Sequence, residues 1–112
     1  SLSAIAYGHI FNLRLMQHTT VSSPELFPLG QVVATTWALE LLEENNLSLN
    51  TFIERHEQGD WGNLGAEDKQ SNNDALKYGD RIFSSYKIHD KKLWIITEWD
   101  RSVTTLLLPD EY

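Results

Sequence analysis

The chain has 112 residues, which is enough for one domain and too few for two. Hydrophobic residues make up 41 % of it and aromatic residues 11 %, so it has the apolar volume for a core and does not belong to the disordered class. Nine Lys and Arg against sixteen Asp and Glu give a net charge of -7, which argues against unaided binding to nucleic acid. No apolar run is long enough for a transmembrane helix.

Cysteine is absent, which excludes disulfides, thiol nucleophiles and cysteine zinc sites. Residues 1–16 lack the basic start and the continuous apolar stretch of a signal peptide. We therefore expect a cytoplasmic protein that has no membrane contact and no cofactor.

The first quarter of the chain predicts one strand, a loop and a second strand. Apolar and polar residues alternate over 9–16, which is typical of a half-buried strand. A helix over 2–17 is the alternative, and Gly8 weakens it. Residues 18–30 are rich in Thr, Ser and Pro and predict a loop, and 31–34 predict a short strand.

The first clear helix is predicted over 36–45, with Thr35 or Thr36 as its N-cap. Its apolar stripe consists of Trp37, Ala38, Leu41 and Leu42. Another face carries the acidic residues Glu40, Glu43 and Glu44. Such a ridge is either a solvated helix face or a contact surface for a basic partner.

Two further helices are predicted, each closed by a glycine. The second runs over 48–58, and its buried stripe ends at His56, where a positive charge would favour the helix dipole. The third runs over 65–78, and its stripe directs Asp68 and Asn72 toward the core, where both would need polar partners.

The last third of the chain predicts a β-meander. Its strands are expected over 81–88, 93–98 and 103–108. The middle strand is apolar on both faces and should be central. The last strand is interpreted as an edge, which either pairs with another copy in a homo-oligomer or is closed by 9–16.

Together these elements predict a single α+β domain over 1–112, with three helices packed on a small antiparallel sheet. Residues 1–25 form a variable N-terminal strand or arm, 35–79 form the helical part and 80–109 form the C-terminal three-stranded meander.

Several spaced motifs resemble a known family. They are 56–64 (His-Glu-Gln-Gly-Asp-Trp-Gly-Asn-Leu), 81–86 (Arg-Ile-Phe-Ser-Ser-Tyr), 94–98 (Trp-Ile-Ile-Thr-Glu) and 100–105 (Asp-Arg-Ser-Val-Thr-Thr). Over about 26–112 the chain resembles small plasmid-related proteins of bacterial mobile elements. It departs from them at Trp37, in a pair where the family has Pro-Gly, and at Trp99, where the family has a small residue. The resemblance implies cargo of a plasmid, integron or conjugative element, and it carries over no catalytic residue.

One candidate for chemistry is the corner between the second and third helices. It holds His56, Asp60, Asp68 and Asn72, beside Trp61. These side chains suit a general acid–base site or a nitrogen–oxygen metal site, as in a small metal-binding protein or hydrolase. The alternative is structural: Asp60 or Asp68 caps a helix, Trp61 fills the corner and His56 bonds a backbone carbonyl.

A second candidate is the last turn, with Trp99, Asp100 and Arg101. Arg101 could grip a carboxylate or phosphate, with Tyr86 nearby, in a small-ligand site. The structural alternative is a local ion pair between Asp100 and Arg101, with Thr97 and Thr104 facing each other across the hairpin.

A third candidate is an aromatic contact surface, because four Trp cannot all be central in so small a core. Trp94 is expected in the core and Trp99 at the surface. The sequence thus favours a non-enzymatic accessory or regulatory protein that binds an unidentified protein partner. The acidic ridge and the turn around Trp99 would be its contact surfaces.

Overall fold

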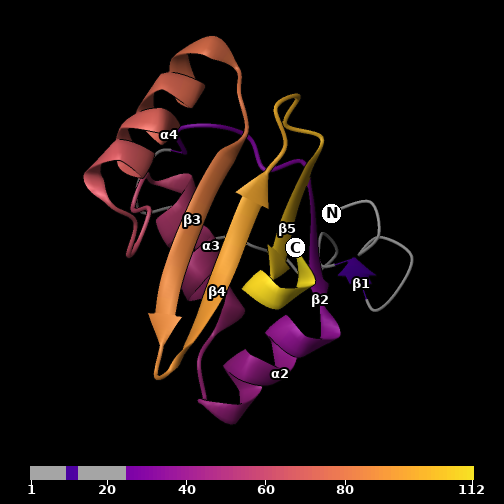
Figure 1. The fold of residues 1–112 in the computed structure, drawn as a ribbon. Coiled ribbons are helices and arrows are strands. Elements are labelled where there is room, and N and C mark those ends of the chain that lie inside the picture. The colour runs from indigo at the N-terminus through magenta and orange to yellow at the C-terminus, as the bar shows by residue number, and fades with distance from the viewer. Residues whose placement is uncertain (1–9, 13–24) are drawn as a thin grey trace.

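The computed structural model describes residues 10–12 and 25–112, which form a five-stranded sheet and three α-helices (Figure 1). The strands are β1 (Ile10–Asn12), β2 (Gln31–Thr35), β3 (Ile82–Ile88), β4 (Lys91–Thr97) and β5 (Val103–Leu107). The helices are α2 (Thr36–Glu44), α3 (Leu49–Glu57) and α4 (Ala66–Tyr78), and a 3-10 turn, η1 (Pro109–Glu111), follows β5. The predicted α+β class and the C-terminal meander β3-β4-β5 are confirmed.

The helix boundaries follow from the predicted caps. The Thr35 side chain accepts a hydrogen bond from the Ala38 amide at 3.1 Å, as an N-cap does. Ser48 is the N-cap residue of α3, and Gly79 ends α4 in the left-handed conformation, at φ 77°. Ser48 makes no side-chain capping hydrogen bond, so among α2, α3 and α4 side-chain capping is observed only at Thr35.

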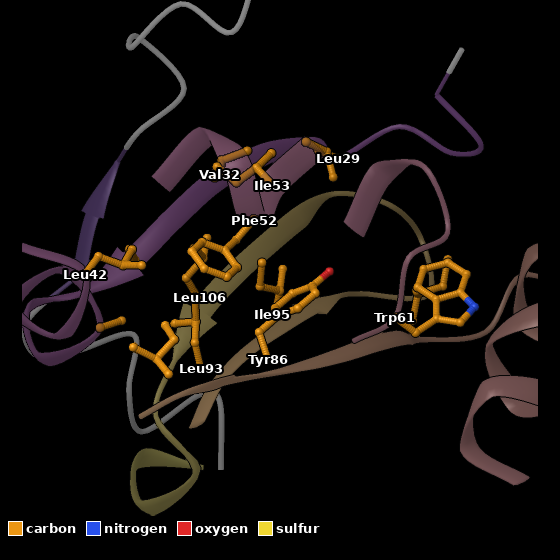
Figure 2. Packing of buried hydrophobic residues seen from close by; sticks show 14 of the residues in the cluster. Leu29, Val32, Leu42, Phe52, Ile53, Trp61, Tyr86, Leu93, Ile95 and Leu106 are labelled. Carbon is orange, nitrogen blue, oxygen red and sulfur yellow. The ribbon is translucent and has the colours of Figure 1, made fainter. Parts of the chain in front are cut away.

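The core lies between the sheet and the two helices α2 and α3 (Figure 1). Figure 2 shows Phe52 and Ile53 of α3 directed at the strands. Sheet residues below them include Tyr86, Ile95 and Leu106, each exposed by 1 % or less. Alternation along each strand directs every second side chain to this face, so the polar residues at those positions are buried as well.

The sheet is mixed, and β5 is not an edge. Its order is β1-β2-β5-β4-β3, in which β2 pairs with β5 in parallel and β4 pairs with it on the other side. The edge prediction for this strand was wrong, and so was its closure by 9–16, because β2 occupies that position. β4 lies between β5 and β3, as its two apolar faces predicted.

The loop before α4 and α4 itself cover the outer edge of β3. The Ser85 amide donates to the Trp61 carbonyl at 3.1 Å, and the Asn63 amide donates to the Ser85 carbonyl at 2.6 Å. Gly62 lies between them at φ 77°, where a Cβ would collide with the Ser85 carbonyl. Two residues earlier on the same strand, the Asn72 side-chain amide bonds both the backbone nitrogen and the backbone oxygen of Phe83. This edge is therefore occupied and cannot take a further strand.

The other face of the sheet carries an aromatic group outside the main core. Trp94 is half-buried and packs edge-on against Phe83 and Tyr112, at centroid distances of 4.9 and 5.8 Å. The Arg81 guanidinium donates to the Tyr112 hydroxyl at 2.5 Å. The expected core position of Trp94 is thus corrected, because odd and even residues of β4 face opposite sides of the sheet.

The N-terminal strand is present where the structure describes it. Ile10–Asn12 pairs antiparallel with β2, which excludes the alternative helix at these three residues. The rest of the predicted segment 9–16 lies outside the described residues. Within 10–12 and 25–112, no helix has the length and hydropathy needed to cross a membrane.

Candidate functional site

His56 is completely buried on α3 and bonds both of its ring nitrogens to hydroxyl groups. Nδ1 lies 2.6 Å from the Ser84 oxygen of β3, and Nε2 lies 2.9 Å from the Thr97 oxygen of β4. Thr97 is in turn 2.7 Å from Thr104, as the predicted cross-hairpin pair requires. The expected bond to a backbone carbonyl is replaced by these two hydroxyls.

The last member of this chain of hydrogen bonds determines all the proton positions. Thr104 donates its single proton to the Leu29 carbonyl at 2.7 Å, so it can only accept from Thr97. Thr97 then has no proton left for His56, whose Nε2–H must donate to it. In the neutral imidazole the other nitrogen, Nδ1, carries no proton and is the acceptor for the Ser84 hydroxyl.

Burial at this position keeps the imidazole neutral. Burial lowers the pKa of His56 to about 3, and the positive charge of Arg101 adds to the effect. The expected stabilisation of a charged His56 by the helix dipole is overturned, because desolvation outweighs it.

The other polar residues of this corner have separate partners. Asp60 forms an ion pair with Arg55 at 2.6 Å, and this pair holds the pKa of the Asp60 carboxyl below its usual range. Asp68 is exposed on α4, which corrects its predicted inward orientation. Asn72 is buried and engaged with the Phe83 backbone, as its need for polar partners predicted.

His56, Asp60 and Asn72 are thus each bonded to a separate partner within the fold. Gly65, not an aspartate, is the N-cap residue of α4, and Asp60 instead accepts a bond from the Gly62 amide at 3.2 Å. Among the described residues, no three His, Asp or Glu side chains are grouped so as to hold a metal ion. Trp61 is 4 % exposed and packs against His56 and Phe27, as the structural alternative expected.

Arg101 is a structural clamp. Its guanidinium donates to the carbonyls of Ala75, Asp80, Glu98 and Trp99 at 2.6 to 3.2 Å. It does not form the expected ion pair with Asp100, which instead accepts from the amide and hydroxyl of Ser102. These bonds fasten the β4–β5 turn to the C-terminal end of α4, where a cation is favourable.

Tyr86 is equally committed to the fold. Its hydroxyl donates to the Asp60 carbonyl at 2.7 Å, its ring lies under Arg55, and burial raises its pKa. The small-ligand site proposed for Arg101 and Tyr86 therefore has few free donors. Trp99, in contrast, is 66 % exposed, as expected.

A hollow of about 230 Å³ lies beside α2. It is lined by Trp37, Glu40, Leu41, Glu44, Lys91 and Leu108. Trp37 is 58 % exposed, so its predicted place in the buried stripe is wrong. The α2 residues of the lining lie three and four positions apart, which places them along one side of the helix.

Two of the three acidic ridge residues belong to this hollow. Glu40 and Glu44 line it, while Glu43 is exposed and lies outside the lining. In the part of the chain that the structure describes, no ion pair reaches any of the three carboxylates. Sequence reasoning identified the glutamates, but it missed Lys91 and Leu108, which only the tertiary fold brings to them.

Comparison of the chain with models of protein families, with curated proteins and with solved structures finds no match.

Proposed function

We propose that this protein is a non-enzymatic accessory protein that binds a partner protein through the surface of α2. The observation that carries the proposal is the hollow beside α2. It joins an exposed tryptophan, Trp37, to Glu40 and Glu44, which form no ion pair with any described residue. Exposed aromatic side chains beside a hollow are typical of interface anchors. By contrast, the buried polar groups of the corner at His56 all serve the fold.

The charge of the surface favours a basic partner. The chain has a net charge of -7, and the carboxylates of α2 are among its exposed acids. Complementary charge raises association rates and fixes orientation. The partner we propose is accordingly a protein that presents a basic segment to this helix.

The biological setting is part of the same proposal. The resemblance to plasmid-related proteins supports an accessory role on a bacterial mobile element, and the lack of cysteine agrees with a cytoplasmic location. The turn around Trp99 is the second candidate contact surface, since this tryptophan is even more exposed than Trp37.

The two exposed tryptophans provide a matched test. The tagged protein is used to capture partners from a bacterial lysate, with and without nuclease treatment, as wild type and as the variants Trp37→Ser and Trp99→Ser. We expect the same captured protein with wild type and Trp99→Ser, and its loss with Trp37→Ser. Capture that survives Trp37→Ser would refute the α2 surface, and capture that disappears with nuclease would show that nucleic acid bridges the contact.

A further inference from the structure

The hollow beside α2 has the size and chemistry for one side chain. Its volume of about 230 Å³ is below the roughly 300–1,000 Å³ of pockets for drug-sized ligands. Leu41 and Leu108 provide apolar lining, and Glu40 and Glu44 provide negative charge one helical turn apart. An occupant with an apolar stem and a cationic end satisfies both parts of this lining.

Trp37 is a second feature that favours a cationic occupant of the hollow. Its exposed indole lies on the side of α2 that carries Glu40 and Glu44, three and seven residues along. A cation over the face of an indole is attracted by the negative face of the ring. On this basis, and resting on the proposed function, we propose that the hollow binds a single lysine or arginine side chain of the partner protein.

Lys91 provides an independent test, because its charge is opposite to that of the glutamates. This exposed residue at the start of β4 lines the hollow together with the glutamates, yet it forms no ion pair with a described residue. Its charge repels an incoming cation and competes with it for the carboxylates. Removal of the Lys91 charge should therefore strengthen binding, whereas removal of either glutamate charge should weaken it.

Blocked tripeptides of alanyl-X-alanine test the inference without the natural partner, with lysine, arginine or the uncharged norleucine as X. Binding is followed by the NMR signal of the Trp37 indole N–H. We expect saturable shifts with lysine and arginine and none with norleucine. Glu40→Gln and Glu44→Gln should each raise the dissociation constant at least about fivefold, and Lys91→Gln should lower it. Glu43→Gln removes the same charge outside the hollow and should change it less than about twofold.

The inference fails if norleucine binds as well as lysine, if Glu43→Gln has the same effect as Glu40→Gln, or if neither cationic peptide binds at its solubility limit. These results leave the proposed function separately testable. Loss of partner capture in Trp37→Ser would still support a contact surface on α2, one that does not select a cationic side chain.

Discussion

His56 joins three parts of the chain through its two ring nitrogens. It connects α3 to β3 at Ser84 and to β4 at Thr97, and the hydrogen bonds continue to the loop before β2. Each buried donor in this series has an acceptor, so the polar groups cost little to bury. Because the buried imidazole is neutral, acid that protonates it should destabilise the fold.

We expect the free energy of unfolding to fall as the pH decreases from 6.5 toward 3. The pKa of His56 is about 3 in the folded protein, against 6.5 ordinarily, so between these pH values the unfolded chain binds more protons than the folded one. The contribution of neutral His56 to stability is therefore fully present above pH 6.5 and is lost as the pH falls. Between about pH 7.5 and about pH 5 the loss from this residue is about 2 kcal/mol. Urea unfolding at both pH values measures it.

The variant His56→Gln is the control for the acid prediction, because it keeps a donor and an acceptor but does not titrate. Its unfolding free energy should change less over the same pH interval. An imidazole of His56 that gains its proton near pH 6.5 in the folded protein, observed by NMR, would contradict the prediction.

A second prediction concerns the direction of the hydrogen bonds. Thr97→Val removes the acceptor for the His56 Nε2–H and leaves this donor buried and unpaired, which costs about 1–3 kcal/mol. Thr105 of β5 follows Thr104, the partner of Thr97, and therefore faces the other side of the sheet. Thr105→Val serves as the comparison and should cost less. Equal losses in chemical denaturation would show that His56 does not depend on Thr97.

At the scale of elements, the sheet is limited on its β3 side by the segment that leads into α4. Trp61 and Asn63 pair with Ser85, and Asn72 pairs with Phe83, so side-chain and loop groups replace a neighbouring strand. Arg101 fastens the C-terminal end of α4 through the carbonyls of Ala75 and Asp80. α4 is therefore held by polar bonds as much as by its few buried residues.

Asn72→Ala tests this role of α4. The substitution removes both bonds to the Phe83 backbone and should lower the unfolding free energy by about 2 kcal/mol. It should also accelerate hydrogen exchange at the Phe83 amide. Gln70→Ala, on the exposed side of α4, should change neither, and an unchanged exchange rate at Phe83 in Asn72→Ala would contradict the assignment.

Local patterns predicted the elements well and their arrangement less well. Caps and periodicity located all three helices and the meander. The parallel pairing of β2 with β5 joins segments about 70 residues apart, which no local pattern reveals. One available signal was not used: Val103–Leu107 carries no charged residue on either face, as expected for a strand that is buried on both sides.

In the candidate site too, local sequence patterns did not reveal which residues are neighbours in the fold. At about 100° per residue, Trp37 lies at the margin of the apolar stripe, so its exposure depends on the neighbouring strands rather than on the helix. Ser84 and Thr97 stand at inward positions of apolar strands, a visible sign of buried polar pairing that sequence reasoning did not connect to His56.

At the scale of the whole molecule, charge should govern association. With a net charge of -7 and a contact surface that contains Glu40 and Glu44, binding to a basic segment should weaken as salt increases. Calorimetric titration of the captured partner at about 0.05 M and about 0.5 M salt measures this. An affinity that does not change with salt would mean that apolar contacts dominate.

The most direct test of the α2 surface is site-specific photo-crosslinking in living cells. A benzoyl-phenylalanine at position 43, beside the hollow but outside its lining, is compared with one at position 74 on the exposed side of α4. We expect one crosslinked partner from position 43 and none from position 74. A partner that crosslinks only from position 74, or equally from both, would contradict it.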